Sequence, residues 1–91
     1  MYKLAFTHQY LKDLKLARKR NLNENELNEV IKLLLSSESL PEKYKDHPLK
    51  GNYKNYRDCH IENDWILIYE KNKSIHLITL IRTGTHSNLF K

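Results

Sequence analysis

The chain has 91 residues, enough for one domain with a single hydrophobic core and too few for two. Its two glycines, two prolines and ordinary apolar content are not those of a disordered or low-complexity chain. Lys and Arg number 16 against 11 Asp and Glu, and this net charge of +5 favours a polyanionic partner, nucleic acid or an acidic protein segment, unless it serves only solubility.

The first predicted elements are a short strand and a basic helix. Residues 2–6 alternate weakly, which suits a strand. From residue 8 to about residue 20 there is no Gly or Pro, and Tyr10, Leu14 and Ala17 recur at helical spacing. The remaining helix surface is cationic, with Lys12, Lys15, Arg18, Lys19 and Arg20. This surface is either simply solvated or binds a nucleic-acid backbone, and the sequence leaves both interpretations open.

A second helix is the clearest element of the chain. Asn23 is a good N-cap, and Glu26 three residues later completes a capping-box pattern. One apolar face follows at the expected spacing, formed by Leu27, Val30, Ile31, Leu34 and Leu35. The helix should end near Ser36-Ser37, and the short link to the first helix predicts an antiparallel helical hairpin.

The second half of the chain is predicted to be mostly strands. Residues 38–55 are polar, contain both prolines, and are expected to be irregular. Three strand-like runs follow at residues 56–62, 65–70 and 75–82, with plausible turns at 63–64 and 72–73. The predicted order is β-α-α-β-β-β, an α+β fold with a helical hairpin packed on one face of a mostly antiparallel four-stranded sheet, in a single domain spanning residues 1–91.

Strand alternation indicates which polar side chains can meet. In the run 56–62, Tyr56, Asp58, His60 and Glu62 should share a face, and in the last strand His76, Ile78, Leu80 and Arg82 should do so. Two successive hairpins return the end of the last strand to the 63–64 turn. This topology predicts one cluster at that edge, with His47 folding over it from the preceding loop: His47, His60, Asp64, Arg82 and His86.

Such a cluster suits the cleavage of RNA without a metal or cofactor. The 2′-hydroxyl of the RNA attacks the adjacent phosphorus, and the 5′-oxygen leaves. Imidazole can accept the first proton and donate the second near neutral pH. A guanidinium such as that of Arg82 binds phosphate oxygens and stabilises the charge that develops on them.

Each of the five residues also has a structural interpretation. His47 could lie in a capped turn, His60 could be an ordinary strand histidine, and His86 could cap the C-terminal turn. Asp64 could serve only to shape the hairpin turn, and Arg82 could pair with Glu62 or Asp64. Their predicted convergence is the reason to prefer the functional interpretation.

A metal site is the main competing use of histidines. His60 and Asp64 lack the i, i+4 helical spacing of such ligands, and cations are interleaved with the cluster. We therefore expect no metal and no cofactor. His8 and His76 lie outside the motifs and are expected to be structural or incidental.

The single cysteine and the hydropathy pattern indicate the compartment. Cys59 cannot form an internal disulfide, so a reducing cytoplasm is the natural setting, and a lone cysteine in a strand is more often a small buried side chain than a nucleophile. No signal peptide is visible, and the longest apolar run, residues 65–69, is too short to cross a bilayer. We expect a soluble cytoplasmic protein with no membrane partner.

Several motifs in order resemble the YafQ branch of the RelE/ParE superfamily of bacterial toxins. The resemblance runs nearly end to end and includes the early stretch Tyr-Leu-Lys-Asp-Leu-Lys-Leu-Ala. Its main motifs are Tyr44-Lys45-Asp46-His47-Pro48-Leu49-Lys50-Gly51, Tyr56-Arg57-Asp58-Cys59-His60, Asp64-Trp65-Ile66-Leu67-Ile68-Tyr69 and Arg82-Thr83-Gly84-Thr85-His86-Ser87-Asn88-Leu89-Phe90. It implies a RelE-like fold and an mRNA interferase that acts in the ribosomal A site.

The resemblance also implies roles for particular residues. His86 would be the general acid and Arg82 would stabilise the transition state, while His60, assisted by Asp64, and His47 would position the RNA and accept the 2′-hydroxyl proton. Which of them is the base remains open. Trp65, unless it belongs to the core, and Phe90 would support the site or contact RNA, Phe90 by stacking on a base.

The implied partners are a neutralising antitoxin and the ribosome with its mRNA. The basic helix surface would then contact ribosomal RNA through Lys12, Lys15, Arg18 and Lys19. Operator DNA would be reached only through the antitoxin complex. Two alternatives remain: a non-catalytic ParE-like toxin that binds a protein target, and a basic nucleic-acid-binding module without chemistry.

Overall fold

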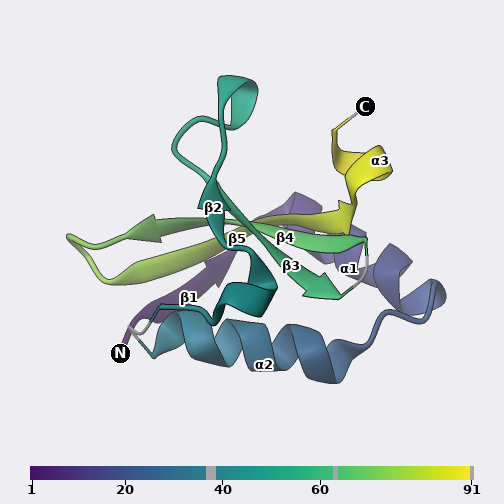
Figure 1. Cartoon of the computed structure of the whole chain (residues 1–91), viewed down its shortest axis with the longest axis horizontal. Coiled ribbons are helices and arrows are strands. Elements are labelled where there is room, and N and C mark those ends of the chain that lie inside the picture. The colour runs from purple at the N-terminus through teal and green to yellow at the C-terminus, as the bar shows by residue number, and fades with distance from the viewer. Residues whose placement is uncertain (37–38, 63, 91) are drawn as a thin grey trace.

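The sheet is built mostly from the second half of the chain. In the computed structural model, which describes residues 1–36, 39–62 and 64–90, its strands follow the order β1-β5-β4-β3-β2 (Figure 1). Within those residues the strands are β1 (Lys3–Phe6), β2 (His47–Pro48), β3 (Arg57–Glu62), β4 (Trp65–Asn72) and β5 (Leu77–Thr85). All neighbouring pairs are antiparallel except β1 with β5, so the predicted mostly antiparallel sheet is confirmed.

The edge strand β2 was not predicted, so the expected number of four strands is one too few for the described residues. It has only two residues, and Pro48 is one of them. So short a strand shows no alternation, and proline is tolerated at a sheet edge because no neighbour needs its N–H. The described rest of this segment, residues 39–55, contains two short 3₁₀ helices, η1 (Glu42–Tyr44) and η2 (Gly51–Tyr53).

Both predicted helices are present, as α1 (His8–Lys19) and α2 (Glu24–Leu35). The hydroxyl of Thr7 caps α1 by accepting a hydrogen bond from the backbone N–H of Tyr10 at 3.0 Å, and it donates to the carbonyl of Ile81 at 2.8 Å. The cap therefore ties the start of α1 to β5. No helix in the described part of the chain has the length and hydropathy that a membrane span requires.

The N-cap predicted for the second helix is confirmed, but the reciprocal bond of the capping box is not, because the backbone N–H of Asn23 donates to Glu62 and not to Glu26. The side-chain oxygen of Asn23 accepts hydrogen bonds from the backbone N–H groups of Asn25 and Glu26. The helix ends at Leu35, with Ser36 as its C-cap, and Ser37 lies outside the described residues. The two helices run in broadly opposite directions around their short link, as predicted (Figure 1).

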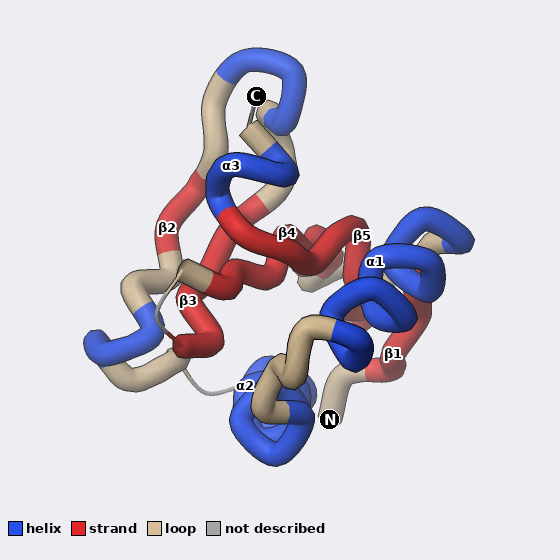
Figure 2. The backbone as a smooth tube through the Cα atoms, turned by 90° about the vertical axis from the view of Figure 1, so that its right-hand side faces the viewer, coloured by secondary structure: helices blue, strands red, loops and turns tan. Residues whose placement is uncertain are grey.

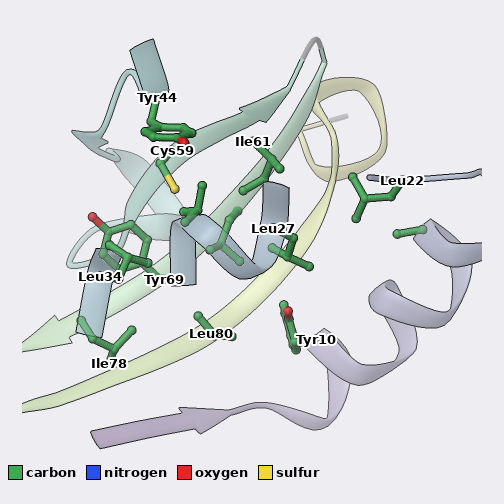
Figure 3. Packing of buried hydrophobic residues seen from close by; sticks show 13 residues of the cluster. Tyr10, Leu22, Leu27, Leu34, Tyr44, Cys59, Ile61, Tyr69, Ile78 and Leu80 are labelled. Atoms are coloured by element: carbon green, nitrogen blue, oxygen red, sulfur yellow. The ribbon is translucent and has the colours of Figure 1, made fainter. Parts of the chain in front are cut away.

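Both long helices pack on one face of the sheet, which we call the helix face. Figure 3 shows Tyr10 of α1 and Leu27 and Leu34 of α2 in one cluster with side chains of the strands. Leu67 and Tyr69 of β4 belong to this cluster and are 0% and 1% exposed. Because burying one side chain of this size contributes about 1.5–3 kcal/mol, this cluster is the main source of stability.

The opposite face of β4 is also buried. Ile66 and Ile68 project from it and are both 0% exposed. They are covered by α3 (His86–Leu89) and by the loop 49–56, not by a long helix. Figures 1 and 2 show this loop and α3 on one side of the sheet and α2 on the other. In the sequence the run 65–70 is apolar on both faces, and in the structure residues 66–69 are buried on both faces of the sheet.

The one-turn helix α3 was not predicted. The hydroxyl of Thr85 caps it by accepting a hydrogen bond from the backbone N–H of Asn88 at 3.3 Å. A Cβ atom at Gly84 would lie 3.3 Å from Cδ2 of Leu89, so the glycine lets α3 pack directly on the sheet. This close approach fixes the position of His86, the first residue of α3.

A β-bulge changes the direction of Arg82. Tyr69 of β4 pairs with Leu80 and its neighbour Ile68 pairs with Arg82, so Ile81 is the extra residue. Cross-strand partners project from the same face, and the faces of Tyr69 and Ile68 are opposite. The prediction that Arg82 shares a face with Leu80 is therefore wrong, because the bulge moves it to the face of Ile68.

A second register shift lies in β3, between His60 and Glu62. The carboxylate of Glu62 accepts a hydrogen bond from the backbone N–H of Asn23, the cap of α2, at 3.2 Å. The prediction that Glu62 shares a face with His60 is therefore wrong. His76, expected in the last strand, lies in the turn before β5 with φ of 53° and stacks on Tyr2.

Candidate active site

The sheet face opposite α1 and α2 carries most of the predicted site residues. His60 of β3 lies opposite Ile66, and Arg82 of β5 lies opposite Ile68. Both therefore project from the face that the long helices leave uncovered. We call this surface the histidine face and define it by His47, Asp58, His60, Arg82 and His86.

Two of the predicted histidines are direct neighbours. The ring centroids of His60 and His86 lie 5.3 Å apart. Nδ1 of His86 donates to Oδ1 of Asp64 at 3.2 Å, which leaves Nε2 of the same ring available to another molecule. Asp64 was expected to orient His60, and this is corrected, because the carboxylate contacts His86 instead. The side chains of His86 and Asp64 are 45% and 58% exposed, so the pair is open to solvent.

The electrostatic environment of His60 favours its neutral form. Burial is the largest influence and lowers the pKa of His60 below its ordinary value of 6.5. The charge of Asp58 acts in the opposite direction, and His86 adds to the lowering. A neutral imidazole at neutral pH can accept a proton.

His47 is held at the sheet edge by the residue before it. Asp46 accepts two hydrogen bonds from Arg57, both 3.2 Å long, and one from the hydroxyl of Tyr69 at 2.5 Å. Nδ1 of His47 donates to the carbonyl of Lys45 at 2.7 Å. This fixes the tautomer when the ring is neutral and directs Nε2 towards the sheet.

Asp58 was not among the predicted site residues, although it lies at the centre of the histidine face. Its Oδ2 lies 3.7 Å from Nε2 of His47, and its Oδ1 has no hydrogen-bond partner among the described residues. The residue is 1% exposed, and this burial raises its pKa, against the attraction of His47, His60 and His86. Its position two residues before His60, on the same strand face, was the signal available in the sequence.

Arg82 is paired with a residue that the sequence did not indicate. Its Nε and Nη2 donate to the two carboxylate oxygens of Asp13 on α1, each at 3.0 Å. The expected partners, Glu62 and Asp64, make other contacts. The bond to Asp13 is the largest cause that raises the pKa of Arg82, and the hydroxyl of Tyr53 raises it further. The guanidinium is therefore a permanent cation beside the histidine face.

Aromatic side chains continue the histidine face. Phe90 is 38% exposed and its ring lies 5.7 Å from that of His86. Tyr53, from the loop that crosses this face, meets Phe90 edge-on at 5.6 Å and was not predicted. Trp65, by contrast, packs half-buried against the helix-face core, which is the structural interpretation left open for it.

The predicted basic surface lies on α1, where Lys12, Lys15, Arg18 and Lys19 are exposed. Arg18 forms an ion pair with Glu24 of α2, with Nε and Oε1 at 2.7 Å. The three lysines have no acidic partner among the described residues. They are therefore the cations on this helix that remain for an external anion.

The remaining candidates lie outside the histidine face. Cys59 is buried on the helix face, and burial raises the pKa of its thiol, so it is not a nucleophile here. His8 is an exposed residue in the first turn of α1. Across the described ranges, no group of three or more His, Cys, Asp or Glu side chains is arranged to hold a metal ion.

Comparison with known proteins extends the resemblance over almost the entire chain. The family model described as "Bacterial toxin of type II toxin-antitoxin system, YafQ" matches residues 2–91. The mRNA interferase toxin YafQ of Escherichia coli K12 is 48% identical over 88 residues, 96% of this chain and 94% of the relative.

Solved structures agree with this match. A chain of the crystal structure of the E. coli DinJ-YafQ complex is similar with a TM-score of 0.90 and 43% identity, and 100% of each chain is covered. The metal-bound toxin from Helicobacter pylori is similar with a TM-score of 0.90 and 38% identity, over 99% of this chain and 100% of that one.

Proposed function

Because this chain belongs to the YafQ family of bacterial type II toxins, we propose that it is an endoribonuclease that cleaves mRNA in the ribosomal A site. The observation that carries the proposal is the pair of neighbouring imidazoles on one face of a basic protein, of which His60 is half-buried and His86 is exposed. One of these rings has a carboxylate partner and the other a lowered pKa, so the two are suited to different proton-transfer roles.

In the proposed reaction the 2′-oxygen of the RNA forms a bond to phosphorus as the bond to the 5′-oxygen breaks. His60 accepts the 2′-hydroxyl proton, since burial keeps its ring neutral. His86 donates a proton from Nε2 to the leaving 5′-oxygen, and Asp64 stabilises the protonated ring through Nδ1. The products are a 2′,3′-cyclic phosphate and a 5′-hydroxyl. Each proton transfer typically contributes about 10²–10⁴-fold to the rate.

Arg82 and an aromatic ring beside the face would position the RNA. Arg82 supplies positive charge for the non-bridging phosphate oxygens, and His47 and Asp58 border the site on the β2 side. Phe90 offers a partly exposed ring on which a base can stack. Asp46, which holds His47 in place through Arg57 and Tyr69, would act only indirectly.

The proposed partners follow from charge and from the relatives. The free lysines of α1 suit contact with ribosomal RNA, since phosphate density rewards distributed cations. The E. coli relative was solved in complex with DinJ, and we extend this to a cognate antitoxin that covers the histidine face. The cytoplasm is the proposed setting, because ribosomes are there.

We propose that the reaction needs no metal. Two imidazoles and a guanidinium supply the base, the acid and the charge stabilisation that the reaction requires. The H. pylori relative is metal-bound, so the requirement has to be measured. Cleavage that continues unchanged in excess chelator supports metal independence, whereas loss with chelator and recovery on adding one divalent ion refutes it.

The test is mRNA cleavage in a purified translation system, with and without ribosomes. Wild type is compared with His86→Ala and with His8→Ala, a matched control outside the histidine face. We expect cuts that require ribosomes, that persist in the control and that disappear with His86→Ala. Intact mRNA with the wild type would refute the nuclease and favour a toxin that binds a protein target. Cleavage by His86→Ala at the wild-type rate would refute the assignment of the acid.

A further inference from the structure

Asp13 is the one acidic residue of α1, and its carboxylate reaches the sheet. It is 8% exposed and accepts four hydrogen bonds. Oδ1 receives Nη2 of Arg82 at 3.0 Å and Nε2 of Gln9 at 3.1 Å. Oδ2 receives Nε of Arg82 at 3.0 Å and the backbone N–H of Thr83 at 3.2 Å. Because an ionised carboxylate accepts about four such bonds, Asp13 has no acceptor left for a substrate.

The backbone contact explains why a carboxylate is placed there. β1 pairs with β5 only as far as Leu80, and Thr7 continues the contact to Leu80 and Ile81. The N–H of Thr83 lies beyond that point, where no strand of the described chain continues β1 to accept its bond. Asp13 supplies the acceptor, so a side chain of α1 satisfies the edge of β5 beyond the end of β1.

The same carboxylate fixes the plane of the Arg82 guanidinium. A bidentate Arg–carboxylate pair uses two of the five N–H groups in a rigid fork. The two N–H groups on Nη1 and the second one on Nη2 are not used by Asp13, and they remain for other acceptors, of which the hydroxyl of Tyr53 is one. Arg82 follows a β-bulge and is only partly buried. Without Asp13, the hydroxyl of Tyr53 would be the one described group left to hold its long side chain in one orientation.

We propose that Asp13 is a positioning residue: it orients Arg82 so that the remaining N–H groups face the scissile phosphate. This inference rests on the proposed nuclease function and assigns a role to a residue outside the histidine face. Asp13 itself touches no substrate. Its effect on the reaction passes entirely through Arg82, and this distinguishes it from a residue that merely stabilises the fold.

The test uses Asp13→Asn, which keeps the shape of the side chain but replaces one acceptor by a donor. Single-turnover cleavage of ribosome-bound mRNA is measured for wild type, Asp13→Asn, Arg82→Ala and the double variant. Misplacing a catalytic group by about 1 Å can lower a rate up to about 10²-fold, so we expect a loss of about 10- to 100-fold for Asp13→Asn. KM should change little, because the loss arises in the transition state. In the Arg82→Ala background, Asp13→Asn should cause no further loss.

Stability is controlled separately, since Asn also weakens the bond to Thr83. Val30→Ala removes part of a fully buried side chain on α2, away from the histidine face, and serves as the destabilised control. We expect Val30→Ala to lower Tm while keeping the wild-type cleavage rate. If Val30→Ala lost as much cleavage rate as Asp13→Asn, the inference would be overturned, because lower stability alone would then explain the slower cleavage by Asp13→Asn.

Three further results would also overturn it. The first is cleavage by Asp13→Asn at the wild-type rate. The second is cleavage by Asp13→Asn that is faster than wild type, which would make Asp13 a competitor of the phosphate for Arg82. The third is a rate loss on adding Asp13→Asn to Arg82→Ala that is as large as the loss in the wild-type background. An inactive wild type would refute the proposed function, and the inference would fall with it. An active wild type with an unaffected Asp13→Asn would refute the inference alone.

Discussion

The buried carboxylate of Asp58 gives the sharpest stability prediction. The side chain is buried, Oδ1 has no hydrogen-bond partner among the described residues, and burial raises the pKa above the ordinary 3.8. A group whose pKa is raised on folding stabilises the protein below its unfolded pKa and loses that contribution as pH rises through the folded pKa. At neutral pH the ionised Asp58 therefore weakens the fold. Asp58→Asn should increase the free energy of unfolding.

The size of the gain follows from the one unsatisfied oxygen. A buried polar group without a partner costs about 1–3 kcal/mol. The introduced amide would still need partners of its own, so we expect the low end, about 1 kcal/mol. For a domain of about 60–100 residues this raises Tm by about 4–8 °C.

Thermal unfolding from pH 3 to pH 8 measures the effect. The difference between Asp58→Asn and wild type should be largest at neutral pH and should vanish near pH 3, where Asp58 is protonated in both the folded and the unfolded chain. His47, His60 and His86 attract the carboxylate, but burial outweighs them. If Asp58→Asn were less stable than wild type at pH 7, the attraction of the histidines would outweigh the cost of burial, and the prediction would be refuted. A gain that is unchanged at pH 3 would refute the electrostatic explanation.

Three further predictions concern activity. Because burial lowers the pKa of His60, the acid limb of the single-turnover pH–rate profile should lie below pH 6.5, and a limb above that value would exclude His60 as the proton acceptor. Phe90→Ala should raise KM about tenfold through lost stacking while Phe90→Tyr does not, and equal KM values for the two variants would exclude a stacking role. Lys12→Glu should weaken ribosome binding and reduce its salt dependence more than Arg18→Glu, because Arg18 is already paired with Glu24; equal effects in a sedimentation assay would contradict this.

The elements that could be predicted are those with a local signal. The cap at Asn23, the helical spacing after it and the double-sided apolar run at 65–70 each specify their own structure within a few residues. The convergence of His60 with His86 also followed from the sequence, since two hairpins return the chain to the same edge. Their catalytic roles remain predictions.

What could not be predicted depends on register and on distant contacts. A single extra residue in β5 turned Arg82 to the other face, and alternation counted from the sequence has no means of locating such a bulge. The partner of that arginine, Asp13, is 69 residues away along the chain. Asp64 contacts His86 and not His60 because α3, unpredicted, carries His86 over the sheet.

The parallel pairing of β1 with β5 has a consequence for the timing of activity. Residues 3–6 pair with residues 77–80, so during synthesis β1 leaves the ribosome first and has no neighbour until nearly the whole chain has followed. His86 and Phe90 come later still, and α1 cannot fix Arg82 before β5 exists. Such non-local closure is expected to be slow. A growing chain therefore carries an incomplete histidine face, and the ribosome that makes this protein is not exposed to its finished form until synthesis is almost over.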